Sequence, residues 1–350
     1  MYYSKLFIKM HHFNLFTEKE RQHLLKKRKG ETKFGEHIQV LPNLTKIYDD
    51  IAHLDVDYVV FGIKEDIGVI ANHGNSGTYG AWDATIKILL NIQSNTFTEA
   101  KRVLVLGHLE YAEERKALLE LNLSKKKEIS KVRNFVEIID RDVTHIITSV
   151  RKAGKIPIII GGGHNNAYGN IKGTALANNQ RINVINFDAH SDFRADEGRH
   201  SGNGFSHAYA EGFLKNYFIF GLHENYTSDT LLNTLKKVKA IKYNTYEAIE
   251  VRNELKYTSE LKAASDHIND RPFGIEVDCD AIKNITSSAM TPSGFSVKKA
   301  RQFVHYFGAH ENAAYLHICE ATPTPNTETQ IGKLISYLIT DFIRAKRNIK

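Results

Sequence analysis

The sequence predicts an α/β fold in which a mostly parallel sheet is covered by helices on both faces. Short, nearly unbroken apolar runs recur along the chain, and amphipathic helical patterns separate them. Strands that are apolar on both sides are typical of parallel sheets buried between layers of helices. About eight strands fit the length. The predicted strands are residues 57–63, 102–107, 156–160, 182–188, 217–222, 239–243, 272–278 and 313–319.

The segments between these runs carry the periodicity of helices with one apolar face. The clearest are residues 17–27, 82–92, 109–121, 129–154, 296–308 and 330–346. We see no repeat, linker or low-complexity tract in the chain. We therefore expect residues 51–350 to form a single α/β domain, with residues 1–50 as an N-terminal extension packed on the same domain.

The basic balance of the chain does not predict binding to nucleic acids. The formal net charge is +7, but the two short basic runs, at residues 26–29 and 125–127, lack interleaved aromatic residues. We interpret them as solvated surface, although the field of a basic protein still favours acidic substrates. No apolar run approaches the roughly 18 residues that span a membrane. The first 16 residues, interrupted by lysines and histidines, make a poor signal peptide.

Both cysteines of the chain, Cys279 and Cys319, lie in apolar runs. Such cysteines indicate reduced thiols, which are usual in the cytoplasm. We therefore expect a cytoplasmic protein that binds neither nucleic acid nor membrane.

Acidic residues and histidines gather directly after the predicted strands, where ligands bind in open parallel sheets. GGGH follows the third strand, DAHSD the fourth and CEATP the last, while EVDCD closes the seventh. On an extended strand end, alternate side chains project to one side, so we expect each motif to present its polar residues together. The candidate metal ligands are His164, Asp188, His190, Asp192, Asp278 and Asp280.

Taken singly, each of these residues has an ordinary explanation as a helix cap or a satisfied polar group. Together, the four carboxylates and two imidazoles predict two divalent ions, whose charges would balance. An oxygen-rich set without thiolate favours manganese over zinc, and two such ions activate a shared water. The glycines before His164 permit a sharp turn; a phosphate cradle is the weaker alternative, because no P-loop motif is present. The motifs thus predict a dinuclear hydrolase centre.

These motifs resemble those of the ureohydrolase family, which includes arginases, agmatinases, guanidinobutyrases and formimidoylglutamases. The resemblance runs from about Tyr58 to the C-terminus and implies the arginase-like three-layer α/β/α sandwich. It also implies a centre of two Mn²⁺ ions in which Asp188 and Asp278 are shared. By position, one ion takes His164, Asp188, Asp192 and Asp278, and the other takes Asp188, His190, Asp278 and Asp280.

The resemblance also implies two catalytic residues. Asp192 would orient the activated water, and Glu320, in EATP, would grip the nitrogens of an amidine or guanidine. The family's closing turn usually ends in an acid, where this chain has Asn326, and its usual GGDH is GGGH here.

Other departures bear on the substrate. Arginases carry a histidine two residues after the Asn of SGN, whereas Asn203 is followed by Gly204 and Phe205. His207 is a candidate substitute, although a surface histidine at a helix start is the simpler interpretation. Arg194 replaces the Asn of arginases, and a guanidinium there pairs well with a carboxylate.

The runs around residues 198–214 and 220–228 look most like formimidoylglutamases, which act in histidine breakdown. Their substrate carries an amidine, for Glu320, and two carboxylates, for Arg194 and Arg199. Asn203 and Glu224 are further predicted substrate contacts. The resemblance therefore implies hydrolysis of N-formimidoyl-L-glutamate to L-glutamate and formamide, by a protein that is a homo-oligomer.

Three alternatives stay open. A guanidino-hydrolase acting on arginine, agmatine or a guanidino acid would release urea. A zinc deacetylase shares the fold but keeps one metal, which His190 and Asp280 argue against. A non-catalytic relative would bind a metabolite or partner, although a site released from catalysis has no need to keep all six ligands.

Overall fold

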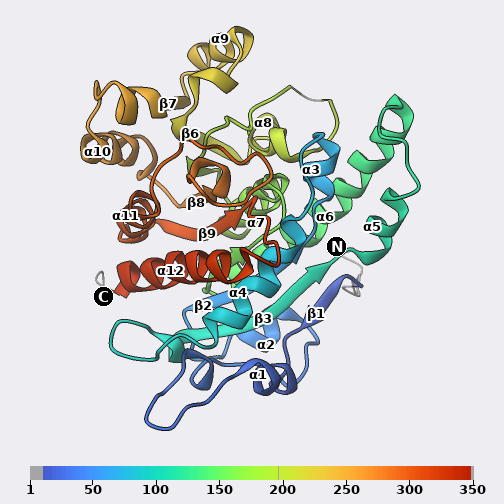
Figure 1. Cartoon of the computed structure of the whole chain (residues 1–350), viewed down its shortest axis with the longest axis vertical. Helices are drawn as coiled ribbons and strands as arrows, with labels where there is room; N and C mark the ends of the chain where they lie inside the picture. The colour runs from blue at the N-terminus through green and yellow to red at the C-terminus, as the bar shows by residue number, and fades with distance from the viewer. Residues whose placement is uncertain (1–10, 196, 348–350) are drawn as a thin grey trace.

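The computed structural model describes residues 11–195 and 197–347, which form one nine-stranded sheet between two layers of helices (Figure 1). The strand order is β1-β3-β2-β4-β9-β8-β5-β6-β7. All neighbouring strands are parallel except β1 and β3. The predicted fold class is confirmed. The strands are β1 (Phe13–Leu15), β2 (Tyr58–Lys64), β3 (Val103–Glu110), β4 (Ile156–Ile160), β5 (Ile182–Phe187), β6 (Leu214–Leu222), β7 (Ile241–Thr245), β8 (Phe273–Asp278) and β9 (Ala313–Cys319).

The helices cover both faces of the sheet, so each central strand is buried on two sides. Val59 and Val60 of β2 show this, because these adjacent residues belong to different apolar cores. Helices α4, α10, α11 and α12 pack over one core, and α2, α3, α6, α7, α8 and α9 over the other. Their bounds, with those of α1 and α5, are α1 (Glu18–Leu24), α2 (Ile47–Ile51), α3 (Ile67–Ala71), α4 (Ala81–Leu89), α5 (Ala112–Leu118), α6 (Lys126–Lys152), α7 (Ala167–Asn178), α8 (Gly204–Ala210), α9 (Asp229–Lys237), α10 (Tyr257–Ile268), α11 (Val297–Gly308) and α12 (Glu328–Arg347).

The ninth strand is β1, which the sequence pattern did not predict. It spans three residues and pairs antiparallel with Gly107 to Leu109 of β3, and a run this short carries no detectable alternation. The close approach of β1 to β3 requires a glycine at position 107, since a Cβ there would lie 2.1 Å from the carbonyl oxygen of Asn14. This strand adds the described part of the N-terminal region to the sheet. Residues 1–10 lie outside the described residues, and the division at residue 50 stays a prediction.

Two predicted helices differ from the observed ones at their ends. The segment predicted at 17–27 is α1, which begins after Thr17 because that side chain caps the first turn in a capping box with Glu20. The segment predicted at 109–121 contains only the shorter α5. Leu109 and Glu110 instead complete β3, where they pair with β2, so backbone pairing in the sheet outweighed their helical pattern.

The sheet order places the polar motifs side by side. Strands β4, β9, β8 and β5 are consecutive neighbours and run parallel. Their carboxyl ends therefore meet along one edge in the middle of the sheet, although the chain between β4 and β9 is more than a hundred residues long. Among the described residues, we find no helix with the length and apolar character that membrane crossing requires.

Candidate metal centre

All six predicted ligands lie together at the carboxyl edge of the four central strands. They come from the carboxyl ends of three of these strands, β4, β5 and β8. His164 opens a short 3₁₀ turn after β4, and Asp188 directly follows β5, with His190 and Asp192 in the bend beyond it. Asp278 is the last residue of β8, and Asp280 lies in the 3₁₀ turn that follows.

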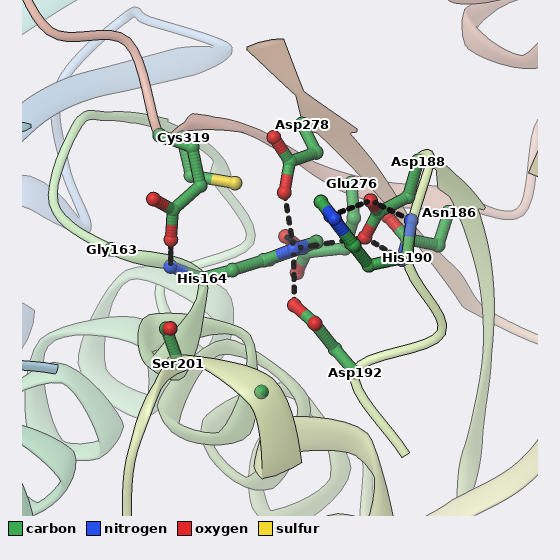
Figure 2. Close-up of polar contacts among 12 residues, drawn as sticks. Gly163, His164, Asn186, Asp188, His190, Asp192, Ser201, Glu276, Asp278 and Cys319 are labelled. Carbon is green, nitrogen blue, oxygen red and sulfur yellow. Dashed lines mark hydrogen bonds and ion pairs between the residues drawn. The ribbon is translucent and has the colours of Figure 1, made fainter. Parts of the chain in front are cut away.

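His164 is the centre of the first group of ligands (Figure 2). Its Nδ1 atom lies 2.9 Å from Asp192 Oδ2, 3.1 Å from Asp278 Oδ2 and 3.2 Å from Asp188 Oδ2. The imidazole, Asp188 and Asp278 are buried, and the Asp192 side chain is 12% exposed. Four donor groups that converge in this way match the set expected for one ion.

The second group is His190, Asp278 and Asp280. His190 Nδ1 lies 3.8 Å from Asp280 Oδ2 and 3.6 Å from Asp188 Oδ1. Asp278 belongs to both groups, and Asp188 borders the second through its other carboxylate oxygen. This arrangement agrees with the expectation that these two aspartates are shared between two ions.

The local backbone differs from the extended strand end that alternation predicted. Strand β5 ends at Phe187, and Asp192 takes a left-handed conformation with φ of 43°. The carboxylates themselves hold the bends: Asp188 Oδ1 accepts from the His190 N–H at 2.7 Å. The convergence was predicted correctly, but it comes from carboxylate-capped turns rather than from strand alternation.

The glycine turn before His164 is held by a residue that the sequence interpretation did not include. Glu65, fully buried, accepts from the Gly163 N–H at 2.7 Å through Oε1 and from the Gly68 N–H at 3.0 Å through Oε2. Gly161 and Gly162 have φ of 82° and 71°, which favour glycine. The Gly163 N–H is thus occupied by a carboxylate of the protein, which disfavours the phosphate-cradle alternative.

The carboxylates of the cluster lie close enough to repel one another. Burial, and then the neighbouring carboxylate of Asp280, raises the pKa of Asp278 well above its usual range. Burial also raises the pKa of Asp192 and of Asp280. Burial opposes the charge of Asp188 too, but hydrogen bonds from His164 and His190 hold its pKa well below the usual range. The carboxylates therefore compete for too little positive charge.

Glu320 lies beside the cluster, directly after β9. Its Oε1 atom accepts from the His164 N–H at 2.5 Å, while its buried Oε2 atom has no hydrogen-bond partner among the described residues. Burial and the charge of Asp280 raise the pKa of Glu320 to about 8. Its φ of 61° is strained for a non-glycine residue, and such strain concentrates at functional sites. One oxygen is thus positioned for a ligand.

The donor chemistry of the cluster fits two divalent ions. Hard oxygen donors predominate, two imidazoles supplement them, and the excess negative charge that raises the carboxylate pKa values is what cations would neutralise. Burial of so many carboxylates without cations would be costly. His164, Asp188, Asp192 and Asp278 would hold one ion, and His190, Asp278, Asp280 and Asp188 the other.

A cavity of about 240 Å³ opens onto these residues. Asp192, Asp280 and Glu320 line its inner part, and Arg194 lies at its exposed side with a side chain that is 50% exposed. Arg194 therefore lines the same cavity as the candidate ligands, and its contact with a substrate stays a prediction.

The other predicted substrate contacts do not line this cavity, and their roles stay predictions. Asn203 is buried, and its amide oxygen accepts from Arg199 at 2.5 Å. Arg199 is itself buried in a two-point ion pair with Asp140. Glu224 is exposed and pairs with Arg252 and Thr245. Asn203 and Arg199 thus brace the backbone before α8, and Glu224 braces the surface around β7.

His207 does not line the cavity either. It is half-buried on α8, where its ring meets the edge of Tyr168 with the centroids 6.4 Å apart. Its position gives no geometric basis for replacing the missing arginase histidine.

A second layer beneath the ligands was also missed. Glu276 Oε2 lies 3.5 Å from His164 Nε2 and 2.5 Å from His317 Nδ1, and Tyr315 donates to Glu276 Oε1 at 2.8 Å. All four side chains are buried. Burial opposes the charge of Glu276, but His317 and His164 lower its pKa to about 2. The spacing Glu276-x-Asp278 on one strand was the available signal, because residues two apart share a face.

This second layer gives His164 a defined orientation. A histidine that binds a metal through one ring nitrogen usually donates from the other to a carboxylate. On the far side of His164, Glu276 Oε2 lies 3.5 Å from Nε2 as an ion-pair contact rather than a hydrogen bond, and Nδ1 faces the aspartates. Cys319, the third member of a buried group with His164 and Glu276, fills the remaining side.

Residues 56–343 of the chain match the model of the arginase family. The chain belongs to the arginase family. Curated formimidoylglutamases are among its relatives. That of Streptococcus gordonii is 29% identical over 198 residues, covering 54% of this chain and 54% of that protein. That of Macrococcus caseolyticus is 24% identical over 300 residues, covering 83% of this chain and 85% of that protein. Several of these alignments thus span only about half of the relative.

Solved structures of this family share the fold. The formimidoylglutamase of Bacillus subtilis superposes with a TM-score of 0.71 at 17% identity, covering 92% of this chain and 94% of that one. The formiminoglutamase of Trypanosoma cruzi with Mn²⁺ superposes with a TM-score of 0.69 at 17% identity, covering 90% and 98%. At this identity the likeness establishes the three-layer arrangement.

The raised pKa values predict how metal-free protein responds to pH. Four carboxyl groups retain protons in the folded state that they lose when the chain unfolds, those of Asp192, Asp278, Asp280 and Glu320. Their contribution to the stability of the folded protein is therefore present at low pH and is lost as pH rises. For Glu320 the loss begins above the ordinary pKa of 4.5 and is complete once the pH passes about 8. The melting temperature of chelator-treated protein should therefore fall between about pH 5.5 and 8.5. Saturating Mn²⁺ should remove this fall. Chelated protein whose melting temperature rises over this range would contradict the interpretation.

Changing Glu276 to Gln tests the second layer. The amide keeps the size of the side chain but weakens the acceptor behind His164, so affinity for Mn²⁺ should fall about 10- to 100-fold. Titration calorimetry on folded protein measures this. Glu113→Gln, on the exposed side of α5, is the matched control. Equal affinities of the two variants would show that Glu276 does not support the ligand.

Proposed function

We propose that this chain is a manganese-dependent amidine hydrolase that converts N-formimidoyl-L-glutamate and water to L-glutamate and formamide. The observation that carries the proposal is the combination of the six-residue cluster with Glu320 Oε2, which is buried beside it and has no protein partner among the described residues. Curated relatives named formimidoylglutamase and a relative's structure with Mn²⁺ support it.

The metal ions, when bound, supply a Lewis acid that activates water for attack on the amidine carbon. The protein's own residues then account for binding and orientation. Glu320 accepts hydrogen bonds from the amidine nitrogens through Oε2, since its other oxygen already holds the backbone of His164. A charged amidine also pairs with the carboxylate and so favours its ionised form. Asp192 lines the cavity beside His164, where its carboxylate can orient the attacking water.

The opposite end of the substrate carries the carboxylates. Arg194 at the exposed side of the cavity offers a guanidinium, which pairs with carboxylates through parallel hydrogen bonds. Amidine-binding and carboxylate-binding groups thus occupy two ends of one cavity. A cytoplasmic location and a homo-oligomeric state stay predictions.

A substrate panel tests the proposed reaction. Manganese-loaded protein is expected to release formamide from formimidoylglutamate with higher kcat/KM than it releases urea from arginine, agmatine or 4-guanidinobutyrate. Formamide, urea and ammonia are scored separately. Faster urea release from any guanidino compound would assign the chain to the guanidino-hydrolases instead, and no turnover with any compound would favour a non-catalytic role.

Changing Glu320 to Gln tests the amidine contact. Loss of a hydrogen bond between charged groups should lower kcat/KM for formimidoylglutamate by about 10- to 150-fold. Glu328→Gln is the control, because Glu328 is an exposed residue of α12 that pairs with Lys87. If the Glu320 variant has the same kcat/KM as the control, Glu320 does not contact the amidine. A manganese titration of both variants shows whether a lower kcat/KM comes instead from weaker metal binding.

A further inference from the structure

The exposed side of the cavity is built around Arg194. Its Nη1 atom donates to Asn72 Oδ1 at 2.7 Å, and its Nη2 atom donates to Glu197 Oε1 at 2.7 Å. Asn72 in turn donates to Ser201 Oγ at 3.2 Å. Arg194, Asn72 and Ser201 all line the cavity. The guanidinium is therefore held at the cavity by one neutral partner and one carboxylate of the protein.

Glu197 occupies a site made of basic groups. Besides Arg194, its Oε1 atom lies 3.2 Å from His200 Nε2, and its Oε2 atom lies 3.7 Å from Arg133 Nη2. His200 Nδ1 accepts from the Gly202 N–H at 3.1 Å, so Nε2 is the protonated nitrogen and donates to Glu197. Arg194 and His200, each three residues from Glu197, and Arg133 on α6 thus surround one carboxylate of the protein.

The contact between Arg194 and Glu197 can be exchanged. Their side chains are 50% and 41% exposed, and an ion pair open to solvent stabilises a protein little because water competes for both partners. Arg133 is less exposed, at 15%, and its other nitrogen contacts the Glu197 carbonyl oxygen. Glu197 therefore keeps Arg133 as a cationic partner if another anion takes its place at Arg194.

Close packing keeps Arg194 in place during such an exchange. A Cβ at Gly202 would lie 3.1 Å from Arg194 Cδ and 3.0 Å from Asn72 Nδ2, so both side chains rest directly on this glycine. The backbone N–H of Arg194 also donates to the Gly202 carbonyl at 3.1 Å. The part of the site that is free to move is the carboxylate of Glu197.

We propose that Glu197 is an internal stand-in for a substrate carboxylate, which displaces it from Arg194 while Asn72 holds the guanidinium. The inference rests on the proposed function, because it takes a carboxylate-bearing amidine as the occupant of the cavity. Glu197 then determines specificity by competition. Glu197 keeps Arg194 paired when the cavity holds no ligand, and only a ligand with a carboxylate of its own can take over the contact with Arg194.

Two variants with the same change of charge test this competition. Glu197→Gln removes the competing carboxylate. Glu211→Gln removes a carboxylate of similar exposure, 43%, that pairs with Lys172 and Tyr168 instead. Each variant loses one negative charge, so any general increase in the attraction of the protein for anions is the same in both variants. Binding of L-glutamate to manganese-loaded protein is measured by calorimetry, and the KM of formimidoylglutamate is compared with that of formamidine, which has no carboxylate.

Glu197→Gln is expected to tighten glutamate binding and to lower the KM of formimidoylglutamate by about two- to fivefold relative to Glu211→Gln. The KM of formamidine should not change. Asn72→Ala should weaken glutamate binding, because the guanidinium loses its neutral support. The proposal is overturned if Glu197→Gln and Glu211→Gln behave alike, if formamidine gains equally, or if no form of the protein binds glutamate.

Failure of the proposed function gives a different pattern. In that case wild-type protein hydrolyses neither amidine, while glutamate binding still separates Glu197→Gln from Glu211→Gln. If wild-type protein hydrolyses formimidoylglutamate but the two variants do not differ, the proposed function stands and only the proposed competition by Glu197 is overturned.

Discussion

Repulsion among buried carboxylates is the constraint on which the rest of this structure depends. Asp188, Asp192, Asp278 and Asp280 lie at one edge of the sheet with two imidazoles between them. Without cations, burial and the neighbouring carboxylates favour protonated carboxyl groups, as the raised pKa of Asp278 and of Asp280 shows. The surrounding structure keeps these groups together despite this cost, through carboxylate-capped turns, the Glu65 clamp on the glycine turn and Glu276 behind His164.

The sheet determines which of these features are rigid. Asp278 ends a strand that is buried on both faces and paired on both sides, so its position follows from the register of the whole sheet. Arg194 lies beyond the strand ends and is half exposed. The two sides of the cavity therefore differ in rigidity: Asp278 cannot shift without the core, whereas Arg194 can change its contacts without moving the sheet.

Sequence reasoning predicted the sheet and the cluster because both depend on strong local signals. Apolar runs identify buried strands, and acids directly after such runs must meet at one edge if the sheet is parallel. It failed for β1, whose three residues carry no period. Asn203 and Glu224, predicted as substrate contacts, pair instead with Arg199, in the same loop as Asn203, and with Arg252, in another loop from Glu224. A polar residue near a site in sequence has many possible partners, and only the packed structure decides among them.

Glu320 connects two events that are chemically separate. One of its oxygens holds the backbone N–H of His164, and the other is buried beside the cavity without a protein partner among the described residues. Any ligand that pulls on the second oxygen also acts on the peptide that carries a metal ligand. Thermodynamic linkage makes such an effect reciprocal: if occupancy of the cavity strengthens the hold on the ions, then the ions strengthen the hold on the occupant by the same factor. A single carboxylate would then couple retention of the ions to occupancy by the substrate.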